Sequence, residues 1–251
     1  MRISNKEANM CSPRKTALIT GASRGIGLAT AARFAEAGYD LILTCRNSFE
    51  QLRQEAAGLE ARFGVQCLAL QADMGCEADV CRVFTQIPRL DVLINNAGIA
   101  HIGLLQDMSS EEWHRILAAN LDSCFYTCRN AIPLMLRSHS GRIINISSVW
   151  GEHGASMEVA YSASKGAVNA FTKALARELA PSHIPVNAIA CGVIDTSMNS
   201  CLSDEDRDAL REEIPMDRFG TPKEVAEVIL QTAEAPEYLT GQIITVDGGW
   251  C

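Results

Sequence analysis

The chain alternates between short, almost wholly apolar runs and longer segments in which apolar and polar positions recur at a helical spacing. Several of the short runs do not alternate with polar residues, which is typical of parallel strands covered on both faces. The runs predict strands at Thr16–Thr20, Leu41–Thr44, Val65–Leu70, Val92–Asn95, Arg142–Ser147, Val186–Ala190 and Gln242–Val246.

The longer segments between these runs predict helices, among them Gly27–Ala37, Ser48–Phe63 and Tyr161–Leu179. Strict alternation of strand and helix implies right-handed crossovers and a doubly wound, parallel sheet of about seven strands flanked by helices. No linker, repeat or low-complexity tract interrupts the pattern. We therefore expect one α/β domain over residues 16–251, preceded by a flexible arm at residues 1–15.

Composition and charge narrow the function classes. The chain has 251 residues, 47% of them hydrophobic, which is enough for one large domain with a proper core. Its formal net charge of -8 argues against a nucleic-acid partner. No apolar run approaches the roughly 18 residues of a membrane span, and the start lacks the apolar centre of a secretory signal. We expect a cytoplasmic protein with no membrane partner.

The cysteines and histidines predict neither a disulfide framework nor a metal site. Ten cysteines occur, but no pair has C-x-x-C spacing, and Cys45, Cys67, Cys124 and Cys128 fall within apolar stretches. They are interpreted as reduced thiols of a cytosolic protein. The five histidines never fall at ligand spacing with a cysteine, so no metal is expected.

A glycine-rich turn follows the first predicted strand. The sequence GASRGIG places Gly21, Gly25 and Gly27 between that strand and a helix. In a first strand–helix turn, such glycines let the backbone approach a pyrophosphate at the positively polarised helix N-terminus. The flanking strand and helix supply the context that a lone glycine triplet lacks, and they favour dinucleotide binding over a plain tight turn.

The end of the second strand helps to choose the dinucleotide. NAD sites commonly place an acid there for the ribose 2′-hydroxyl, whereas this chain has Cys45 followed by Arg46, and Arg24 lies inside the glycine turn. Guanidinium groups without a carboxylate suit a 2′-phosphate, so NADPH (NADP) is favoured over NADH. In the alternative interpretation both arginines are ordinary surface charges.

Tyr161 and Lys165 are separated by three small residues in YSASK. On a helix they share one face, about 6 Å apart along the axis. A free tyrosine has a pKa of about 10, and a neighbouring ammonium favours the phenolate, so Lys165 is expected to lower the pKa of Tyr161. The pair would then form a proton donor for reduction of a ketone, although a solvated helix face could carry the same residues.

These motifs together resemble the short-chain dehydrogenase/reductase (SDR) family over the chain from Thr16 onward. The likeness rests on TGASRGIG (Thr20–Gly27), NNAG (Asn95–Gly98), a serine ahead of Y-x-x-x-K, and DGGW (Asp247–Trp250). It implies a Rossmann-type fold and a catalytic group of Asn120, Ser148, Tyr161 and Lys165. Two alternatives stay open: Asn120 could merely bridge helix to sheet, and Ser147 could be the functional serine.

The resemblance also implies a set of NADPH-binding residues along the chain. Cys191 stands where the family usually has proline, so the loop after it loses a fixed φ angle. The implied residues are Gly21, Ser23, Arg24, Gly25, Ile26, Gly27, Arg46, Asp73, Met74, Asn95, Ala97, Gly98, Tyr161, Lys165, Gly192, Val193, Ile194 and Thr196.

Within the family the chain is most similar to 3-oxoacyl-(acyl-carrier-protein) reductases of fatty acid synthesis. That likeness implies a small or carrier-bound ketone substrate, with Ser148, Trp150 and Glu158 in its pocket. Where such enzymes are expected to have arginines for the acidic carrier, this chain has His139 and Ser182, with Arg137 and Arg142 close in sequence.

Two other substrates stay open within the class. Carboxylates at Glu152 and Glu158 suit a cationic ketone, and the pattern is similar to reductases of 5-aminopentanone-modified lysine on elongation factor P. Hydroxysteroid dehydrogenases are a further option. A non-catalytic scaffold is disfavoured, because such proteins usually lose the tyrosine or the lysine.

Two expectations concern the last third of the chain. The polar segment from Ser197 to Pro215 is predicted to form a mobile lid over the substrate. The strand at Gln242–Val246 is predicted to lie at the sheet edge, which in family terms is part of a homotetramer (dimer of dimers) interface. The alternative is a covered edge in a monomer.

Overall fold

The computed structural model describes residues 14–199 and 203–251, so most of the predicted N-terminal arm lies outside the described residues. One parallel sheet of seven strands forms its centre, in the order β3-β2-β1-β4-β5-β6-β7. The strands are β1 (Thr16–Ile19), β2 (Asp40–Cys45), β3 (Cys67–Gln71), β4 (Val92–Asn95), β5 (Arg142–Ser148), β6 (Val186–Cys191) and β7 (Ile243–Val246). The predicted fold class is confirmed, and β7 lies at an edge as expected.

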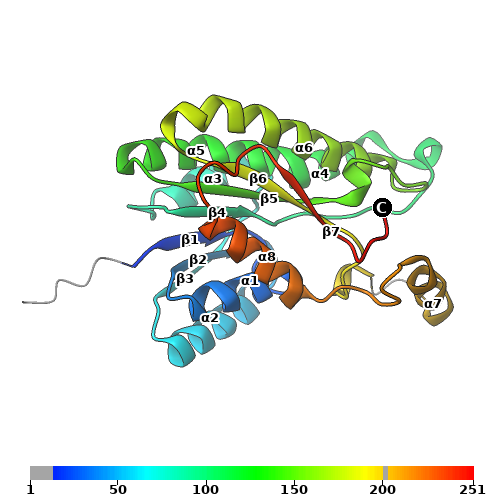
Figure 1. The fold of residues 1–251 in the computed structure, drawn as a ribbon, viewed down its shortest axis with the longest axis horizontal. Helices are drawn as coiled ribbons and strands as arrows, with labels where there is room; N and C mark the ends of the chain where they lie inside the picture. Colours follow the sequence, from blue (N-terminus) through cyan, green and yellow to red (C-terminus); the bar gives the residue numbers. More distant parts are fainter. Residues whose placement is uncertain (1–13, 200–202) are drawn as a thin grey trace, which may run out of the picture.

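Helices cover both faces of the sheet (Figure 1). Helices α1, α2 and α8 lie against one face, and α3, α4, α5 and α6 lie against the other. Their bounds are α1 (Gly25–Glu36), α2 (Phe49–Phe63), α3 (Glu77–Phe84), α4 (Ser110–Leu117), α5 (Ser123–Ser138), α6 (Val159–Leu179), α7 (Asp204–Glu213) and α8 (Pro222–Glu234).

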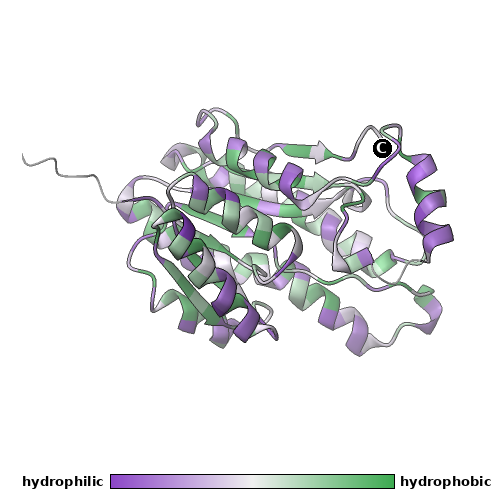
Figure 2. Ribbon diagram, turned by 90° about the horizontal axis from the view of Figure 1, so that it is seen from below, coloured by the Kyte–Doolittle hydropathy of each residue, from purple (hydrophilic) through white to green (hydrophobic). Residues whose placement is uncertain are grey.

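Each face of the sheet has its own hydrophobic core. One core packs Phe34 of α1 and Leu52 of α2 against β1 and β2, and the other packs Met135 of α5 and Val80 of α3 against the opposite face. Because strands such as β4 are buried on both faces, their sequences are apolar throughout. Figure 2 shows this hydrophobic interior, and it shows α7 as a largely hydrophilic helix at the end where the C-terminus lies.

The strand order reverses direction between β1 and β4, which is the switch point of a doubly wound sheet. Loops that follow the carboxyl ends of β1 and β4 diverge there and leave a crevice, the usual ligand site of such folds. The glycine turn follows β1 and the NNAG motif follows β4. The fold therefore brings these two motifs together at one edge of the sheet.

Candidate active site

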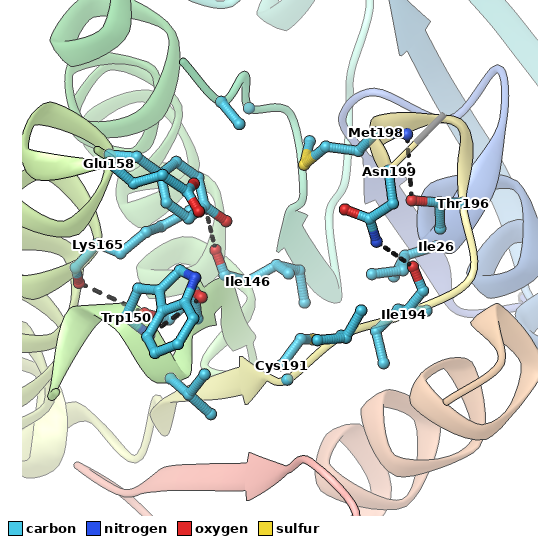
Figure 3. Close-up of a pocket in the computed structure, with 18 of the residues that line it drawn as sticks. Ile26, Ile146, Trp150, Glu158, Lys165, Cys191, Ile194, Thr196, Met198 and Asn199 are labelled. Atoms are coloured by element: carbon cyan, nitrogen blue, oxygen red, sulfur yellow. Dashed lines mark hydrogen bonds between the residues drawn. The ribbon is translucent and has the colours of Figure 1, made fainter. Parts of the chain in front are cut away.

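A cavity of about 300 Å³ lies at the carboxyl edge of the sheet. Its walls come from the glycine turn, the loops after β4, β5 and β6, the start of α6, and the segment around α7. In Figure 3, Glu158, Trp150 and Lys165 stand on one side of this cavity, and Met198, Asn199 and Thr196 face them from the other.

The glycine turn fits a dinucleotide because side chains at its glycine positions would fill the space that a pyrophosphate needs. Gly21 and Gly25 have φ angles of 66° and 58°, in the left-handed region that favours glycine. A Cβ atom on Gly27 would lie 2.3 Å from the Gly21 carbonyl oxygen, so only glycine lets the first turn of α1 approach this loop. The cradle thus exposes backbone N–H groups at a helix N-terminus, as a pyrophosphate requires.

Asn96 holds this turn in place, and the sequence interpretation missed it. Its Nδ2 atom donates to the carbonyl oxygens of Thr20 at 2.9 Å and Gly21 at 3.1 Å. Asn96 also lines the cavity. The signal was present as the second asparagine of NNAG, but its partners, which follow β1 directly, could be found only from the pairing of β1 with β4.

The two arginines lie on the cofactor side of the fold. Arg24 is exposed and occupies the N-cap of α1, and Arg46 is exposed just after β2. The Arg46 Nε atom lies 3.1 Å from an oxygen of Asp73, another residue that the resemblance implies for cofactor binding. The ion pair places the guanidinium and the carboxylate side by side next to the end of β2.

Two residues expected to bind the cofactor direct their side chains into the core. Asn95 is 4% exposed, donates to Asn145 at 2.9 Å and accepts from Thr127 at 2.7 Å. Met74 is also 4% exposed and packs in the core under α3 and α5. Only the backbone of these two residues is therefore available to a ligand, and the side chain of Asn95 anchors β4 to β5 and α5 instead.

Lys165 is buried at the bottom of the cavity. Its Nζ atom donates to the carbonyl oxygen of Ile146 at 2.8 Å. Burial lowers the pKa of Lys165 from its ordinary value, because the charged form loses its hydration. The backbone carbonyl holds the amine in one position at the cavity floor.

Tyr161 faces the cavity with Ser148, but its titration differs from the expectation. Burial raises the pKa of Tyr161, and the hydrogen bond with Ser148 only partly opposes this shift. The Nζ atom of Lys165 lies 5.6 Å from the centre of the tyrosine ring and is bound to Ile146. The expectation that Lys165 lowers the pKa of Tyr161 is therefore wrong for this structure, because desolvation raises that pKa and the group that opposes the shift is Ser148, not Lys165.

The two serines at the end of β5 have different surroundings. Ser148 lines the cavity and hydrogen-bonds with Tyr161, and its side chain also accepts from the backbone N–H of Trp150 at 3.2 Å. Ser147 also borders the cavity, but it is 2% exposed, and its hydroxyl donates to the Lys165 carbonyl oxygen at 3.4 Å. This geometry favours Ser148 over Ser147 as the substrate-facing serine.

Asn120 lies in one turn of π-helix, Ala118–Asp122, between α4 and α5. It is 1% exposed, and its amide exchanges hydrogen bonds with the Ile99 backbone at 2.8 and 2.9 Å and donates to Ser164 at 2.9 Å. All three bonds join the helix to the β4 loop and to α6. The bridging interpretation of Asn120 therefore describes its contacts, and its amide oxygen and the Lys165 Nζ atom both border the space where a Cβ on Gly98 would lie.

The loop after β6 is fixed although Cys191 replaces the usual proline. Ile194 forms a parallel bridge with Gly220, and backbone bonds join Asp195 and Val193 to the same glycine at 2.8 and 2.9 Å. Gly192, Val193, Ile194 and Thr196 all line the cavity. Burial raises the pKa of the Cys191 thiol to about 12, so the thiol is neutral and acts as packing. The loss of a fixed φ angle is offset by these backbone bonds.

Aromatic rings and one carboxylate form the outer wall. Trp150 and Trp250 meet edge to face, with ring centroids 4.8 Å apart, and Glu158 lies beside them in the lining. Trp250 was not among the expected pocket residues, because nothing in the sequence joins it to Trp150.

The predicted lid contributes Met198 and Leu210 to the lining. Its residues 200–202 lie outside the described residues, and its mobility stays a prediction.

The residues proposed to receive a carrier protein lie away from this cavity. His139 follows α5, and Ser182 follows α6. Arg142 begins β5, at the opposite end from Ser148, and its guanidinium donates to the Ala233 and Ala235 carbonyl oxygens. The guanidinium of Arg142 is thus bound at the end of α8.

The eight cysteines in the described part of the chain are all free thiols, and no cluster of metal-ligating side chains occurs there. None of the helices in residues 14–199 and 203–251 is long and apolar enough to cross a membrane.

Comparison with known proteins gives matches over nearly the full chain. A family model described as short chain dehydrogenase matches residues 15–207. The chain is 39% identical over 238 residues to the uncharacterized oxidoreductase YmfI of Bacillus subtilis (strain 168), covering 94% of this chain and 98% of that protein. It is 40% identical over 240 residues to the 3-oxoacyl-(acyl-carrier-protein) reductase FabG of Aquifex aeolicus (strain VF5), covering 94% and 96%.

A solved structure shows the same architecture. The chain superposes with a TM-score of 0.90 on YwfH, described as an NADPH-dependent reductase involved in bacilysin biosynthesis. The two are 26% identical, and the match covers 95% of this chain and 99% of that one. The two chains therefore share this fold over nearly their whole length.

Proposed function

The chain belongs to the short-chain dehydrogenase family, and from that premise we propose that it reduces a ketone to a secondary alcohol with NADPH. The observation that carries the proposal is the meeting of Tyr161, Ser148 and Lys165 in one cavity that adjoins the glycine cradle. The Tyr161 and Ser148 hydroxyl groups, which would bind the substrate oxygen, therefore line a cavity next to the cofactor site.

The chemistry follows from the contacts of these residues. The cofactor site would hold NADPH, which when bound would supply the hydride for the carbonyl carbon. Tyr161 gives its proton to the carbonyl oxygen, while the Ser148 hydroxyl donates to the same oxygen and orients it. Because burial raises the pKa of Tyr161, the phenol keeps its proton at neutral pH. It gives up that proton when the substrate oxygen becomes more basic than a phenolate. Lys165, held by Ile146, is proposed to position the nicotinamide ribose.

Replacing the phenol tests this assignment. In Tyr161→Phe the proton donor is lost, and we expect turnover to fall by roughly 10²–10⁴-fold, with NADPH binding retained. Tyr126→Phe is the matched control, since Tyr126 lies on α5 and packs against Phe125. NADPH absorbance reports turnover, and fluorescence titration reports binding. Near-normal rates in Tyr161→Phe would show that another group donates the proton.

For the substrate, the relatives support a 3-oxoacyl group on an acyl carrier protein. A second candidate is favoured by the pocket itself, because Glu158 places a carboxylate in its lining. That candidate is a cationic ketone, such as the 5-aminopentanone-modified lysine of elongation factor P. NADPH oxidation with an acetoacetyl thioester, a steroid ketone and the modified elongation factor compares the candidates directly, and activity on the last alone would overturn the first.

We also propose a cytoplasmic homotetramer. The edge position of β7 and the exposed Phe125 on α5 support self-association. Size-exclusion chromatography with light scattering measures the mass, and a monomer at micromolar concentration would refute the tetramer.

A further inference from the structure

Helix α7 stands apart from the two helical layers that cover the sheet (Figure 1). It has ten residues, and none of them is buried. An isolated helix shorter than about 12–15 residues is only marginally stable in water. The capping box of Ser203 and Asp206 satisfies the first turn alone. The helix therefore depends on a few contacts with the rest of the protein for its place and its persistence.

One face of α7 makes these contacts. Arg207, Leu210 and Arg211 are its partly buried residues, while the other residues of the helix, most of them acidic, are exposed. The spacing of three and four continues to Ile214, which is 3% exposed just after the last turn. Leu210 lines the catalytic cavity. The position of this face therefore determines part of the cavity wall.

Arg207 joins this face to the loop that follows β6. Its Nη2 atom donates to the Asp195 Oδ1 atom at 2.9 Å, and its guanidinium carbon lies 5.0 Å from the centre of the Phe219 ring. Asp195 follows Ile194 and Phe219 precedes Gly220. Because Ile194 and Gly220 form a parallel bridge, Arg207 binds residues on both sides of a backbone pairing that is itself fixed.

A second attachment lies at the C-terminal end of α7. Ile214 is buried there, and the Met216 N–H donates to the Gly248 carbonyl oxygen at 3.3 Å. Leu210 lies between this attachment and Arg207. The C-terminal attachment alone would leave the first half of the helix free to swing away from the cavity.

The remaining cation of α7 does not duplicate the contact of Arg207. Arg211 pairs with Asp208 on the same helix and with Asp217 in the segment that follows it. Among the described residues, Arg207 therefore makes the one ion pair between α7 and the loop after β6.

The interactions of Arg207 are small one by one. Its side chain is 32% exposed and that of Asp195 is 61% exposed, so water screens the ion pair. The ion pair and the contact with the Phe219 ring together shift an equilibrium by roughly 3–30-fold. That is enough to decide the position of a short helix with no buried residue.

We propose that Arg207 is a positioning residue, which holds α7 against the loop after β6 and thereby keeps Leu210 in the wall of the substrate pocket. The inference rests on the proposed ketone reduction and adds a residue that touches neither the cofactor nor the reacting atoms. Arg207 acts on substrate binding through Leu210, and the transfer of hydride and proton does not depend on it.

Hydrogen–deuterium exchange of the NADPH-bound protein tests the position of α7 without any substrate. In Arg207→Ala the amides of α7 should exchange roughly 3–30-fold faster, because the released helix is too short to persist alone. Arg207→Lys keeps the charge without the planar guanidinium and should restore part of the protection. Unaltered exchange of α7 in Arg207→Ala would overturn the proposal.

Arg129→Ala is the matched control for both measurements. Arg129, on α5, also combines an ion pair, with Glu77, and a ring contact, with its guanidinium carbon 5.0 Å from the centre of the Phe125 ring. Its loss removes the same kinds of interaction away from α7, so the exchange of α7 and the KM should stay as in the wild type.

Steady-state kinetics with an acetoacetyl thioester separate a positioning role from a catalytic one. In Arg207→Ala the KM should rise by roughly 3–30-fold while kcat stays within about twofold. Raising the salt from about 0.1 M to about 1 M should raise the KM of the wild type toward that of the variant, whose own KM should not change. A fall in kcat at unchanged KM would refute the positioning role.

Tyr161→Phe distinguishes this proposal from the reduction on which it rests. That variant should lose turnover and keep the slow exchange of α7, and turnover that persists in it would refute the proposed reduction. If the wild type does not reduce the thioester, the exchange of α7 in Arg207→Ala decides the positioning role by itself.

Discussion

Replacing Gly27 by alanine should disrupt the cofactor site through one misplaced methyl group. The added Cβ atom would lie 2.3 Å from the Gly21 carbonyl oxygen and 2.6 Å from the Asn96 Nδ2 atom, and real Cβ atoms do not approach closer than 3.0 Å. The glycine turn or the start of α1 must therefore shift by about 0.7 Å or more, as those separations require. The shift separates Asn96 from its two backbone acceptors, Thr20 and Gly21.

The magnitude follows from these contacts. Two weakened hydrogen bonds cost about 1 kcal/mol each, and overpacking in a tight site adds about 1–3 kcal/mol. We expect the free energy of unfolding to fall by about 2–4 kcal/mol, on those two contributions. Because the same turn cradles the pyrophosphate, the Kd for NADPH should rise by at least about tenfold.

Chemical denaturation and fluorescence titration with NADPH measure the two effects. Gly58→Ala is the matched control, since a Cβ on Gly58, within α2, would meet no atom within 4 Å. That change should raise stability by about 0.5–1 kcal/mol, because alanine favours a helix over glycine, and should leave the Kd unaltered. If Gly27→Ala bound NADPH as tightly as the wild type, the reasoning about the glycine cradle would be wrong.

Two further predictions concern charge. Arg46→Ala should weaken NADPH binding by about tenfold and NADH binding by much less, since only NADPH carries the 2′-phosphate. Titration with both cofactors measures this, with Arg53→Ala on α2 as the control. Equal losses of affinity for the two cofactors would contradict the prediction. Arg218 lowers the pKa of Glu224 from 4.5 to about 2, so the stabilisation from Glu224 is present above pH 4.5 and is lost as the pH falls toward 2. The difference in unfolding free energy between wild type and Glu224→Gln should shrink over that range, and a constant difference would refute the assignment.

The strands and the order of elements were predictable because apolar runs reflect burial on both faces. β4 was predicted with its observed bounds, Val92–Asn95. β3 begins at Cys67 and not at Val65, because its pairing with β2 starts at Leu41 and Cys67, while the Gln66 N–H is bound by the Asp40 carboxylate. Such a boundary depends on the partner strand, which hydrophobic periodicity along one segment does not report.

The candidate site was predictable where residues are close in sequence and not where the fold joins distant segments. Tyr161 and Lys165 lie one turn apart on α6, as their spacing indicated. The direction of the tyrosine pKa shift depends on burial by neighbouring loops, and the spacing alone could not give it. The same holds for Trp250, which meets Trp150 only because the chain after β7 returns across the end of β5.

The π-helical turn at Ala118–Asp122 has a consequence for the rotational phase of the helices beside it. Such a turn accommodates one residue more than an α-helical turn, and each residue of an α-helix advances the rotation by about 100°. The wider turn takes up this extra residue, so α5 keeps the phase that a continuous α-helix with one residue fewer would give it. If the extra residue were built as regular α-helix, the following helix would rotate by about that angle, and Thr127 and Met135 would leave the core together; the π turn thus keeps the whole of α5 in phase with the sheet.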